Sequence, residues 1–175
     1  IYITGRNDNL RTVGVDEFLP GHFEADVIFT GQDVYGYAMR KTNVRGTVSG
    51  LWDLTGTGGA ILGTFYAGAT AADWQLLAPD SYVYYLYTLG DMAGLSLTGD
   101  YYGTIYSRGG LFIPTITANG TDGVYNMSIQ KFYAGPVADV SVNAAGGIWV
   151  VSVADWQDTD AVRDTLNVGW IGSLY

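Results

Sequence analysis

Short apolar runs recur along the whole chain and are separated by glycine, aspartate and asparagine. Valine, isoleucine, threonine and tyrosine dominate these runs, and residues of this kind favour β-strands. The clearest runs lie at 25–30, 35–40, 47–54, 60–66, 82–89, 101–107 and 148–153. Many short strands at a spacing of roughly 8–12 residues are typical of a β-sandwich or β-barrel, so the pattern predicts an all-β protein.

Individual runs also predict how strands are covered and joined. Residues 82–89 are apolar on both alternating faces, which predicts a strand covered on both sides, whereas 95–98 alternate as a strand with one face in water. The runs 116–118 and 124–132 flank a turn at 119–123, where Asn-Gly-Thr-Asp-Gly accepts positive φ. This arrangement predicts a β-hairpin.

Signals for helices are few. Thr70, with Asp73 three residues later, predicts a single capped helical turn before Pro79, and 158–166 predict a second short helix. Fifteen aspartates but only two glutamates are present. Because aspartate hydrogen-bonds its own backbone and favours turns, the chain is expected to be rich in loops and poor in helix.

Residues 71–107 carry a distinctive order of features. A capped turn and a proline precede a Tyr-Val-Tyr-Tyr-Leu strand, and a glycine turn at 90–94, a Leu-Ser-Leu strand and a Thr-Gly pair lead into a last strand. This order resembles the end of the immunoglobulin-like β-sandwich domains in bacteriophage structural proteins, such as the N-terminal domain of baseplate upper proteins. Residues 53–56 (Asp-Leu-Thr-Gly) match a sequence common in that family.

The resemblance implies an immunoglobulin-like β-sandwich over residues 21–114. An N-terminal arm at 1–20 would precede it, and a smaller β-rich domain or extension at 115–175 would follow. The resemblance also implies a virion component of a tail, baseplate, neck or head fibre, with no catalytic residues to carry over.

Composition and charge narrow the classes of partner. Hydrophobic residues make up 48% of the chain and charged residues 14%, which favours a large buried or interfacial area. The net charge of −9 argues against binding to nucleic acid or to anionic membranes. No apolar run is long enough to span a bilayer, and one histidine without cysteine argues against transition-metal sites. We therefore predict no cofactor, no nucleic-acid partner and no membrane insertion.

The sequence gives little indication of a catalytic site. His22 follows a Pro-Gly pair, and the serine of 46–50 (Gly-Thr-Val-Ser-Gly) lies one place too late for a nucleophile elbow. Glu24 and Asp26 share a strand face with Glu17 nearby, as a glycosidase would require, but charge on a solvated strand edge explains them better. We predict that the protein is not an enzyme.

Four aspartates close in sequence offer the oxygen ligands that calcium favours: Asp155, Asp158, Asp160 and Asp164. Their spacing lacks the order of an EF-hand loop. Acidic capping of a helix start is the preferred interpretation, and a calcium site is the alternative.

The chain holds 14 tyrosines, six phenylalanines and five tryptophans. Tyrosine and tryptophan on exposed strands could form a carbohydrate platform, or they could fill a core and a subunit interface. The tryptophans are spread along the sequence at Trp52, Trp74, Trp149, Trp156 and Trp170, so the core and interface are preferred. Ala-Asp-Trp-Gln occurs at 72–75 and 154–157, but the flanking residues do not align, so we interpret this repeat as coincidence.

These observations predict a structural, self-assembling subunit located in a virion or outside the cell, with a phage tail, baseplate, fibre or head decoration protein preferred. Terminal β-prone stretches can add to a neighbour's open sheet edge. The predicted interface residues are Ile1, Tyr2, Ile3, Leu166, Val168, Trp170 and Ile171. The expected partners are copies of the chain and other assembly subunits, with cell-surface glycan as a further candidate. A secreted pilus or thread subunit assembled by strand addition and a carbohydrate-binding β-sandwich module stay open as alternatives.

Overall fold

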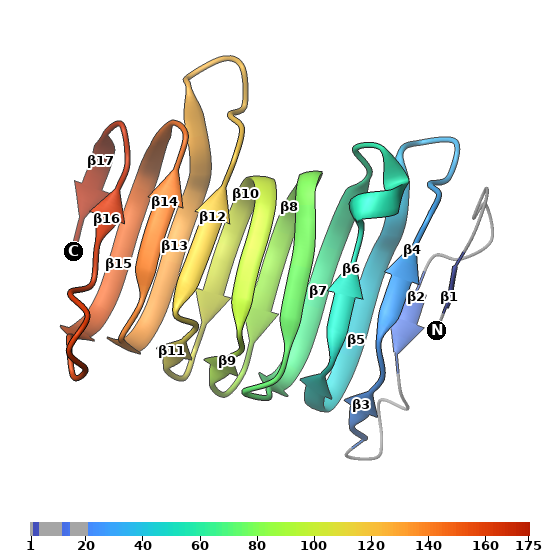
Figure 1. Ribbon diagram of the computed structural model, residues 1–175, viewed down its shortest axis with the longest axis horizontal. Helices are drawn as coiled ribbons and strands as arrows, with labels where there is room; N and C mark the ends of the chain where they lie inside the picture. Colours follow the sequence, from blue (N-terminus) through green and yellow to red (C-terminus); the bar gives the residue numbers. More distant parts are fainter. Residues whose placement is uncertain (1, 4–11, 15–20) are drawn as a thin grey trace.

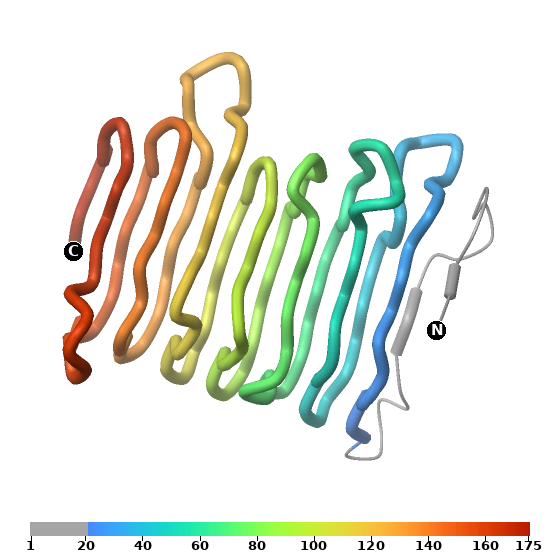
Figure 2. Tube along the Cα trace, viewed as in Figure 1, coloured from blue at the N-terminus to red at the C-terminus, as the bar shows by residue number. Residues whose placement is uncertain are grey.

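The computed structural model describes residues 2–3, 12–14 and 21–175 of the 175-residue chain. The chain winds through about seven turns, and each turn places a short strand on one side and a long strand on the other (Figures 1 and 2). All described strand pairs are parallel. The fold is therefore a parallel β-solenoid, in which each coil pairs with the coils before and after it.

The two sides of the solenoid form two stacks of strands. The short-strand sheet contains β1 (Tyr2–Ile3), β4 (Val27–Phe29), β6 (Leu51–Asp53), the first parts of β8 (Gln75–Thr88) and β10 (Ser96–Ser107), β12 (Thr115–Ala118), β14 (Ser141–Ala144) and β16 (Leu166–Asn167). The long-strand sheet contains β2 (Thr12–Gly14), β5 (Tyr37–Ser49), β7 (Ile61–Thr70), the second parts of β8 and β10, β13 (Met127–Ala138), β15 (Gly147–Gln157) and β17 (Ile171–Leu174).

Short elements complete the coils. At the lower edge in Figure 1, β3 (Phe23–Glu24), β9 (Met92–Ala93) and β11 (Leu111–Phe112) add to the long-strand sheet. A single turn of 3-10 helix, η1 (Thr55–Thr57), follows β6. Among the described residues, no helix has the length and hydropathy needed to cross a membrane.

The coils differ in length. Paired residues on neighbouring coils are separated by 19 positions between Leu97 and Ile116, but by 27 between Tyr102 and Ile129. The loops absorb the difference, and the loop at 119–126 projects beyond its neighbours at the top of Figure 1. The strands thus keep a common register while the connections vary.

The core is built from inward-facing side chains that stack from coil to coil, because alternate residues of a strand face opposite sides. In the short-strand sheet, one fully buried column contains Val27, Trp52, Leu76, Leu97, Ile116 and Val142. In the long-strand sheet, a second column contains Met39, Leu62, Val83, Tyr102, Ile129 and Ile148, and a third contains Phe65, Leu86, Ile105, Phe132 and Val151. Each coil buries its apolar residues against those of its neighbours.

The prediction of an all-β protein is confirmed, but the immunoglobulin-like β-sandwich over 21–114 and the phage-domain resemblance are wrong. An immunoglobulin-like sandwich pairs antiparallel strands, whereas the strands here pair in parallel with the next coil. Successive short strands with polar turns produce the same local pattern in both folds. Both sheets also continue across Pro114, since β12 pairs with β10 and β14 in the short-strand sheet and β13 pairs with β10 and β15 in the long-strand sheet. Independent folding of 115–175 stays a prediction.

Three local predictions are also wrong. The hairpin around 119–123 does not form, because β12 pairs with β10 and β14, and β13 pairs with β10 and β15. Thr70 ends β7, and a turn without helix follows it. Residues 158–165 form bends and irregular structure before β16 instead of a helix. In each case, turn-forming residues close a coil instead of capping a helix or joining a hairpin.

Tyr102 gives a direct test of the core. Its side chain is fully buried, burial raises the pKa of its phenol, and its hydroxyl has no hydrogen-bond partner in the described part of the chain. Because burying an unpaired hydroxyl is unfavourable, Tyr102→Phe is expected to raise the free energy of unfolding by about 1 kcal/mol in urea denaturation. The matched control is Tyr82→Phe, at an exposed ring, and it is expected to leave the free energy of unfolding unchanged. A loss of stability in Tyr102→Phe would contradict the unpaired state of this hydroxyl.

Candidate ligand-binding face

Outward-facing side chains of the long-strand sheet also align from coil to coil. On four successive coils, one column holds tyrosine, and we call this column the tyrosine ladder: Tyr66, Tyr87, Tyr106 and Tyr133. In-register parallel strands lie about 4.8 Å apart, so equivalent rings on neighbouring coils are brought into contact. The regular backbone of the solenoid therefore positions these rings.

The rings of the ladder contact one another in sequence. Tyr66 and Tyr87 have ring centroids 5.0 Å apart with planes 7° from parallel, and Tyr87 and Tyr106 are also 5.0 Å apart but tilted by 58°. Tyr106 and Tyr133 are 6.0 Å apart and nearly perpendicular, at 87°. Tyr85, from the neighbouring column, stacks on Tyr87 at 6.0 Å. The stack is regular at one end and opens at the other.

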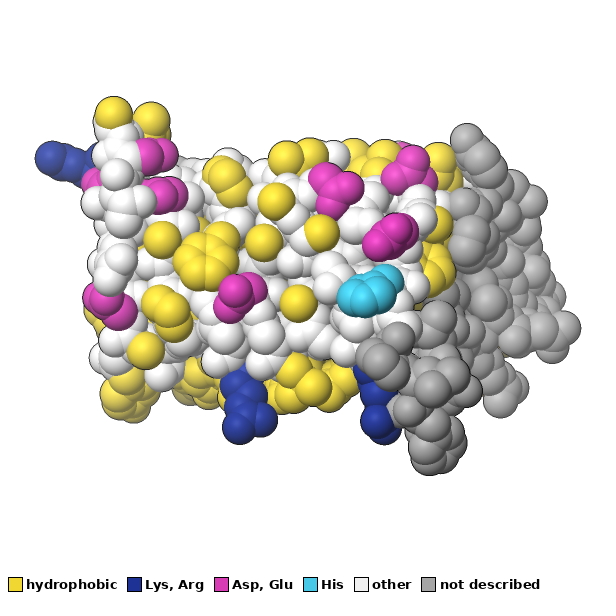
Figure 3. All heavy atoms as spheres, turned by 90° about the horizontal axis from the view of Figure 1, so that it is seen from below, with side chains coloured by type: hydrophobic (Ala, Val, Ile, Leu, Met, Phe, Trp, Pro, Cys, Tyr) yellow, Lys and Arg dark blue, Asp and Glu magenta, His cyan; other side chains and the backbone are white. Residues whose placement is uncertain are grey.

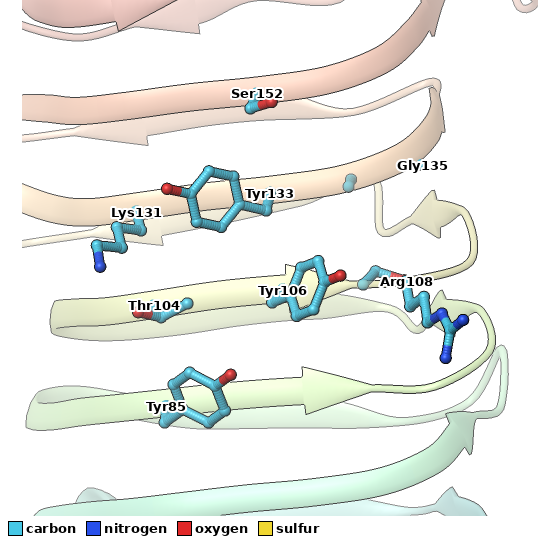
Figure 4. Close-up of a pocket in the computed structure, with 10 residues that line it drawn as sticks. Tyr85, Thr104, Tyr106, Arg108, Lys131, Tyr133, Gly135 and Ser152 are labelled. Atoms are coloured by element: carbon cyan, nitrogen blue, oxygen red, sulfur yellow. The ribbon is translucent and has the colours of Figure 1, made fainter. Parts of the chain in front are cut away.

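A groove lies where the stack opens. It has a volume of about 560 Å³, and three tyrosines line it together with the hydroxyl side chains of Thr104 and Ser152. Figure 4 shows Tyr85, Tyr106 and Tyr133 one above another on β8, β10 and β13. Gly135 also lines the groove, and a Cβ there would lie 2.4 Å from the carbonyl oxygen of Gly109, so glycine is required where the coils approach.

A second hollow lies at the other end of the ladder. Its volume is about 440 Å³, and Asn43, Arg45, Tyr66 and Leu89 line it. Both hollows lie on the long-strand sheet, at opposite ends of the same column of rings. The two hollows and the tyrosine ladder between them therefore form one extended surface along the solenoid axis.

Basic side chains accompany the ladder. The groove contains Arg108 and Lys131, both exposed, and neither forms an ion pair with another described residue. Lys41 and Arg45 lie on β5 beyond the other end of the ladder. In the long-strand sheet, β5, β7, β13, β17 and the second parts of β8 and β10 contain no aspartate or glutamate, and β15 contains one, the exposed Asp155 near its end.

Tyr85 acts as a neutral hydrogen-bonding group in the groove. Burial, and to a smaller degree the neighbouring phenols of Tyr87 and Tyr106, raise the pKa of Tyr85. Its hydroxyl therefore keeps its proton at neutral pH and can both donate and accept a hydrogen bond. The groove combines ring surface, hydroxyls and two cations.

The candidate calcium residues are only partly brought together. Carboxylate oxygens of Asp158 and Asp160 lie within 4.8 Å of one another and of Asp139, which sequence reasoning missed because it lies in an earlier turn. Asp155 accepts a hydrogen bond from Gln157. Asp164 accepts one from the indole of Trp156, at 2.8 Å.

Asp139 already has partners within the chain. Its carboxylate accepts hydrogen bonds from the hydroxyl and amide of Thr159, at 2.6 and 2.7 Å, and from the amide of Asp160, at 3.1 Å. These bonds hold the pKa of Asp139 below its usual value. Closing of the 158–165 loop explains this group of carboxylates, and the calcium site stays an untested alternative.

The predicted assembly residues lie at both ends of the solenoid. Tyr2 and Ile3 form β1, which pairs with β4 of the same chain, and Ile1 lies outside the described residues. The C-terminal residues contact their own chain: Leu166, Val168 and Ile171 pack partly buried against the core, and Trp170 packs edge-on against Trp149 at 6.1 Å. Assembly through these residues stays a prediction.

The residues weighed for catalysis lie where coils meet. The imidazole of His22 accepts a hydrogen bond from the Thr47 amide at 3.1 Å, and Asp26 accepts one from the Leu51 amide at 2.8 Å. Both bonds connect one coil to the next. Glu24 is exposed on β3, and Glu17 lies outside the described residues.

Two of the five tryptophans confirm the core interpretation, since Trp52 and Trp74 are fully buried. Trp156 stacks on Phe132 at 6.1 Å, whereas Trp149 is 51% exposed. The two Ala-Asp-Trp-Gln segments occupy different places in their coils, one entering β8 and the other ending β15, which fits coincidence. The aromatic row on the surface is formed by tyrosines that are distant in sequence and aligned in space.

The chain matches no protein-family model, no curated protein and no solved structure.

Proposed function

We propose that the protein binds an extended polysaccharide along the tyrosine ladder. The main support for this proposal is the alignment of four tyrosines on successive coils, with a hollow at each end of the column. Aromatic rings pack against the C–H faces of sugars, while phenol hydroxyls hydrogen-bond to sugar hydroxyls. A linear polymer of repeating units fits a surface whose contacts also repeat.

The lining of the groove supports binding rather than hydrolysis. Glycosidases use a pair of carboxylates across the scissile bond, and the residues that line the larger groove include no carboxylate. Thr104, Ser152 and the tyrosine hydroxyls supply polar contacts around the rings. We therefore propose that carbohydrate binding takes place on a β-solenoid and not on a β-sandwich module.

The ladder is tested by removing its central ring. Tyr106 contacts Tyr87 on one side and Tyr133 on the other and lines the groove. Tyr106→Ala is expected to weaken polysaccharide binding about tenfold, because the lost aromatic contact is of the order of 1.4 kcal/mol. Affinity electrophoresis and calorimetry with a panel of soluble neutral and acidic polysaccharides measure the effect.

The matched control is Tyr125→Ala. This ring is 66% exposed in the 119–126 loop and lies outside the tyrosine ladder. The Tyr125→Ala variant is expected to bind polysaccharide as tightly as the unmodified protein does. Circular dichroism checks that both variants keep the fold. Absence of binding to every polysaccharide, or equal binding by the Tyr106 variant, would refute the proposed function.

A structural role in a virion or another extracellular assembly stays a prediction. The virion assignment followed from the phage-domain resemblance, which the parallel pairing of the strands overturns. The fold therefore adds no support to a phage component, and the glycan is the partner that the described surface favours.

A further inference from the structure

We infer that the polysaccharide bound by the tyrosine ladder is acidic, carrying carboxylate or sulfate groups. This inference rests on the proposed function and specifies its ligand. It follows from the charges around the groove and from the distribution of charge over the molecule.

Two cations flank the rings of the groove. Lys131 lies on β13, two residues before Tyr133. Arg108 follows the end of β10, two residues after Tyr106. Figure 4 shows them on opposite sides of the column of rings. A sugar chain that packs on Tyr106 and Tyr133 would therefore have a cation within reach on either side.

These cations are free to meet an external anion. Both side chains are exposed, and neither has an ion-pair partner among the residues that the structure describes. Arg40 provides a contrast, because Asp33 neutralises it through two hydrogen bonds of 2.9 and 2.7 Å. The groove thus presents charge that the protein itself does not compensate.

Charge is segregated over the whole molecule. The net charge is −9, yet the strands that carry the ladder and its flanking columns hold a single carboxylate, Asp155 near the end of β15. Figure 3, which looks at the lower edge, shows basic side chains (dark blue) projecting beside hydrophobic ones (yellow) along its lower border, with carboxylates (magenta) set back from it. An acidic polymer is attracted to this face and repelled elsewhere.

Single-stranded nucleic acid also uses aromatic and basic side chains, but this face suits it less well. Binding to a phosphate backbone depends on neutralising many phosphates, and the larger groove supplies only Arg108 and Lys131. The remaining lining groups are hydroxyls and phenols, which match the hydroxyls of a sugar chain. The observations therefore favour an acidic glycan.

The experiment compares polymers that share a backbone and differ in charge. Polygalacturonate is paired with its methyl-esterified form for carboxylates, and dextran sulfate is paired with dextran for sulfates. We expect the acidic member of at least one pair to bind at least tenfold more tightly than its neutral partner in dilute salt. The difference should shrink as salt is raised, since exposed charges are screened.

The protein variants locate the effect. The double variant Lys131→Gln with Arg108→Gln is expected to lose about tenfold in affinity for the acidic polymer and little for the neutral one. Arg163→Gln removes an exposed arginine of the 158–165 loop, outside the ladder face, and is expected to bind normally. All three positions are exposed, so the fold should be kept.

The outcomes separate the two proposals. Equal binding of neutral and acidic partners, with loss in Tyr106→Ala but not in the double variant, would overturn the acidic ligand and leave polysaccharide binding intact. Binding of no polymer would overturn both. Tighter binding of oligothymidylate than of either acidic polysaccharide, lost in the double variant, would assign the face to nucleic acid.

Discussion

Phe65→Ala is expected to lower the free energy of unfolding by about 4 kcal/mol, because it removes a large, fully buried ring. Phe65 is fully buried and stacks on Trp74 with ring centroids 5.0 Å apart. It also meets the edge of Trp52 at 5.2 Å. Removing the ring leaves a cavity between coils whose backbones are fixed by strand pairing. Denaturant unfolding followed by tryptophan fluorescence measures the loss.

Thr64→Ala is the matched control. Thr64 precedes Phe65 on β7 but faces outward in the column that also holds Tyr85. Its truncation is expected to change stability by no more than about 0.5 kcal/mol. Similar losses in the two variants would show that the inward and outward faces of β7 are assigned wrongly.

Asp33→Asn is expected to destabilise the protein by about 2 kcal/mol at neutral pH. One carboxylate oxygen of Asp33 accepts hydrogen bonds from the amides of Tyr35 and Tyr37, at 2.8 and 2.9 Å. The other accepts two from the guanidinium of Arg40, which also lies over both tyrosine rings. Loss of the negative charge leaves this arginine without its counter-ion.

The effect of Asp33 depends on pH. Burial opposes ionisation of Asp33, but the bonds from the Tyr37 amide, Arg40 and the Tyr35 amide outweigh it and hold the pKa below 3.8. A lowered pKa stabilises the folded state above the unfolded value, and this contribution is lost as the pH falls through the folded value. The difference between the wild type and Asp33→Asn should therefore be full at pH 7 and shrink below about pH 4. Asp73→Asn, at an exposed turn, is the control for loss of a carboxylate and should change the free energy of unfolding at pH 7 by no more than about 0.5 kcal/mol.

The positions of the strands could be predicted from the sequence, but their pairing could not. The run 60–66 overlaps β7 and the run 101–107 falls within β10, because β-branched and aromatic residues favour strands whichever strands they pair with. Pairing depends on the coil repeat, which varies from 19 to 27 residues between partners such as Leu97 with Ile116 and Tyr102 with Ile129. No fixed period in the sequence reveals such a repeat.

The tyrosine ladder was hidden for the same reason. Tyr66 and Tyr87 are 21 positions apart, whereas Tyr106 and Tyr133 are 27 apart, so the column is visible only once the register is known. The run 82–89 was expected to be covered on both sides because tyrosine counts as apolar. In the structure, Val83 and Leu86 face the core while Tyr85 and Tyr87 face outward. The phenol hydroxyl is what permits this half-exposed position.

The parallel stacking of the coils also determines how the molecule would respond to force. Backbone hydrogen bonds between coils run along the long axis, so every interface between coils carries the same tension along that axis, and a terminal coil, which has only one neighbour, can detach without breaking a second interface. Each coil contacts mainly its neighbours, so resistance to a pull along the axis depends on the individual interfaces between adjacent coils. A detached coil would release roughly 60–95 Å of chain, so the molecule would lengthen stepwise and dissipate a pull in small increments instead of failing at once.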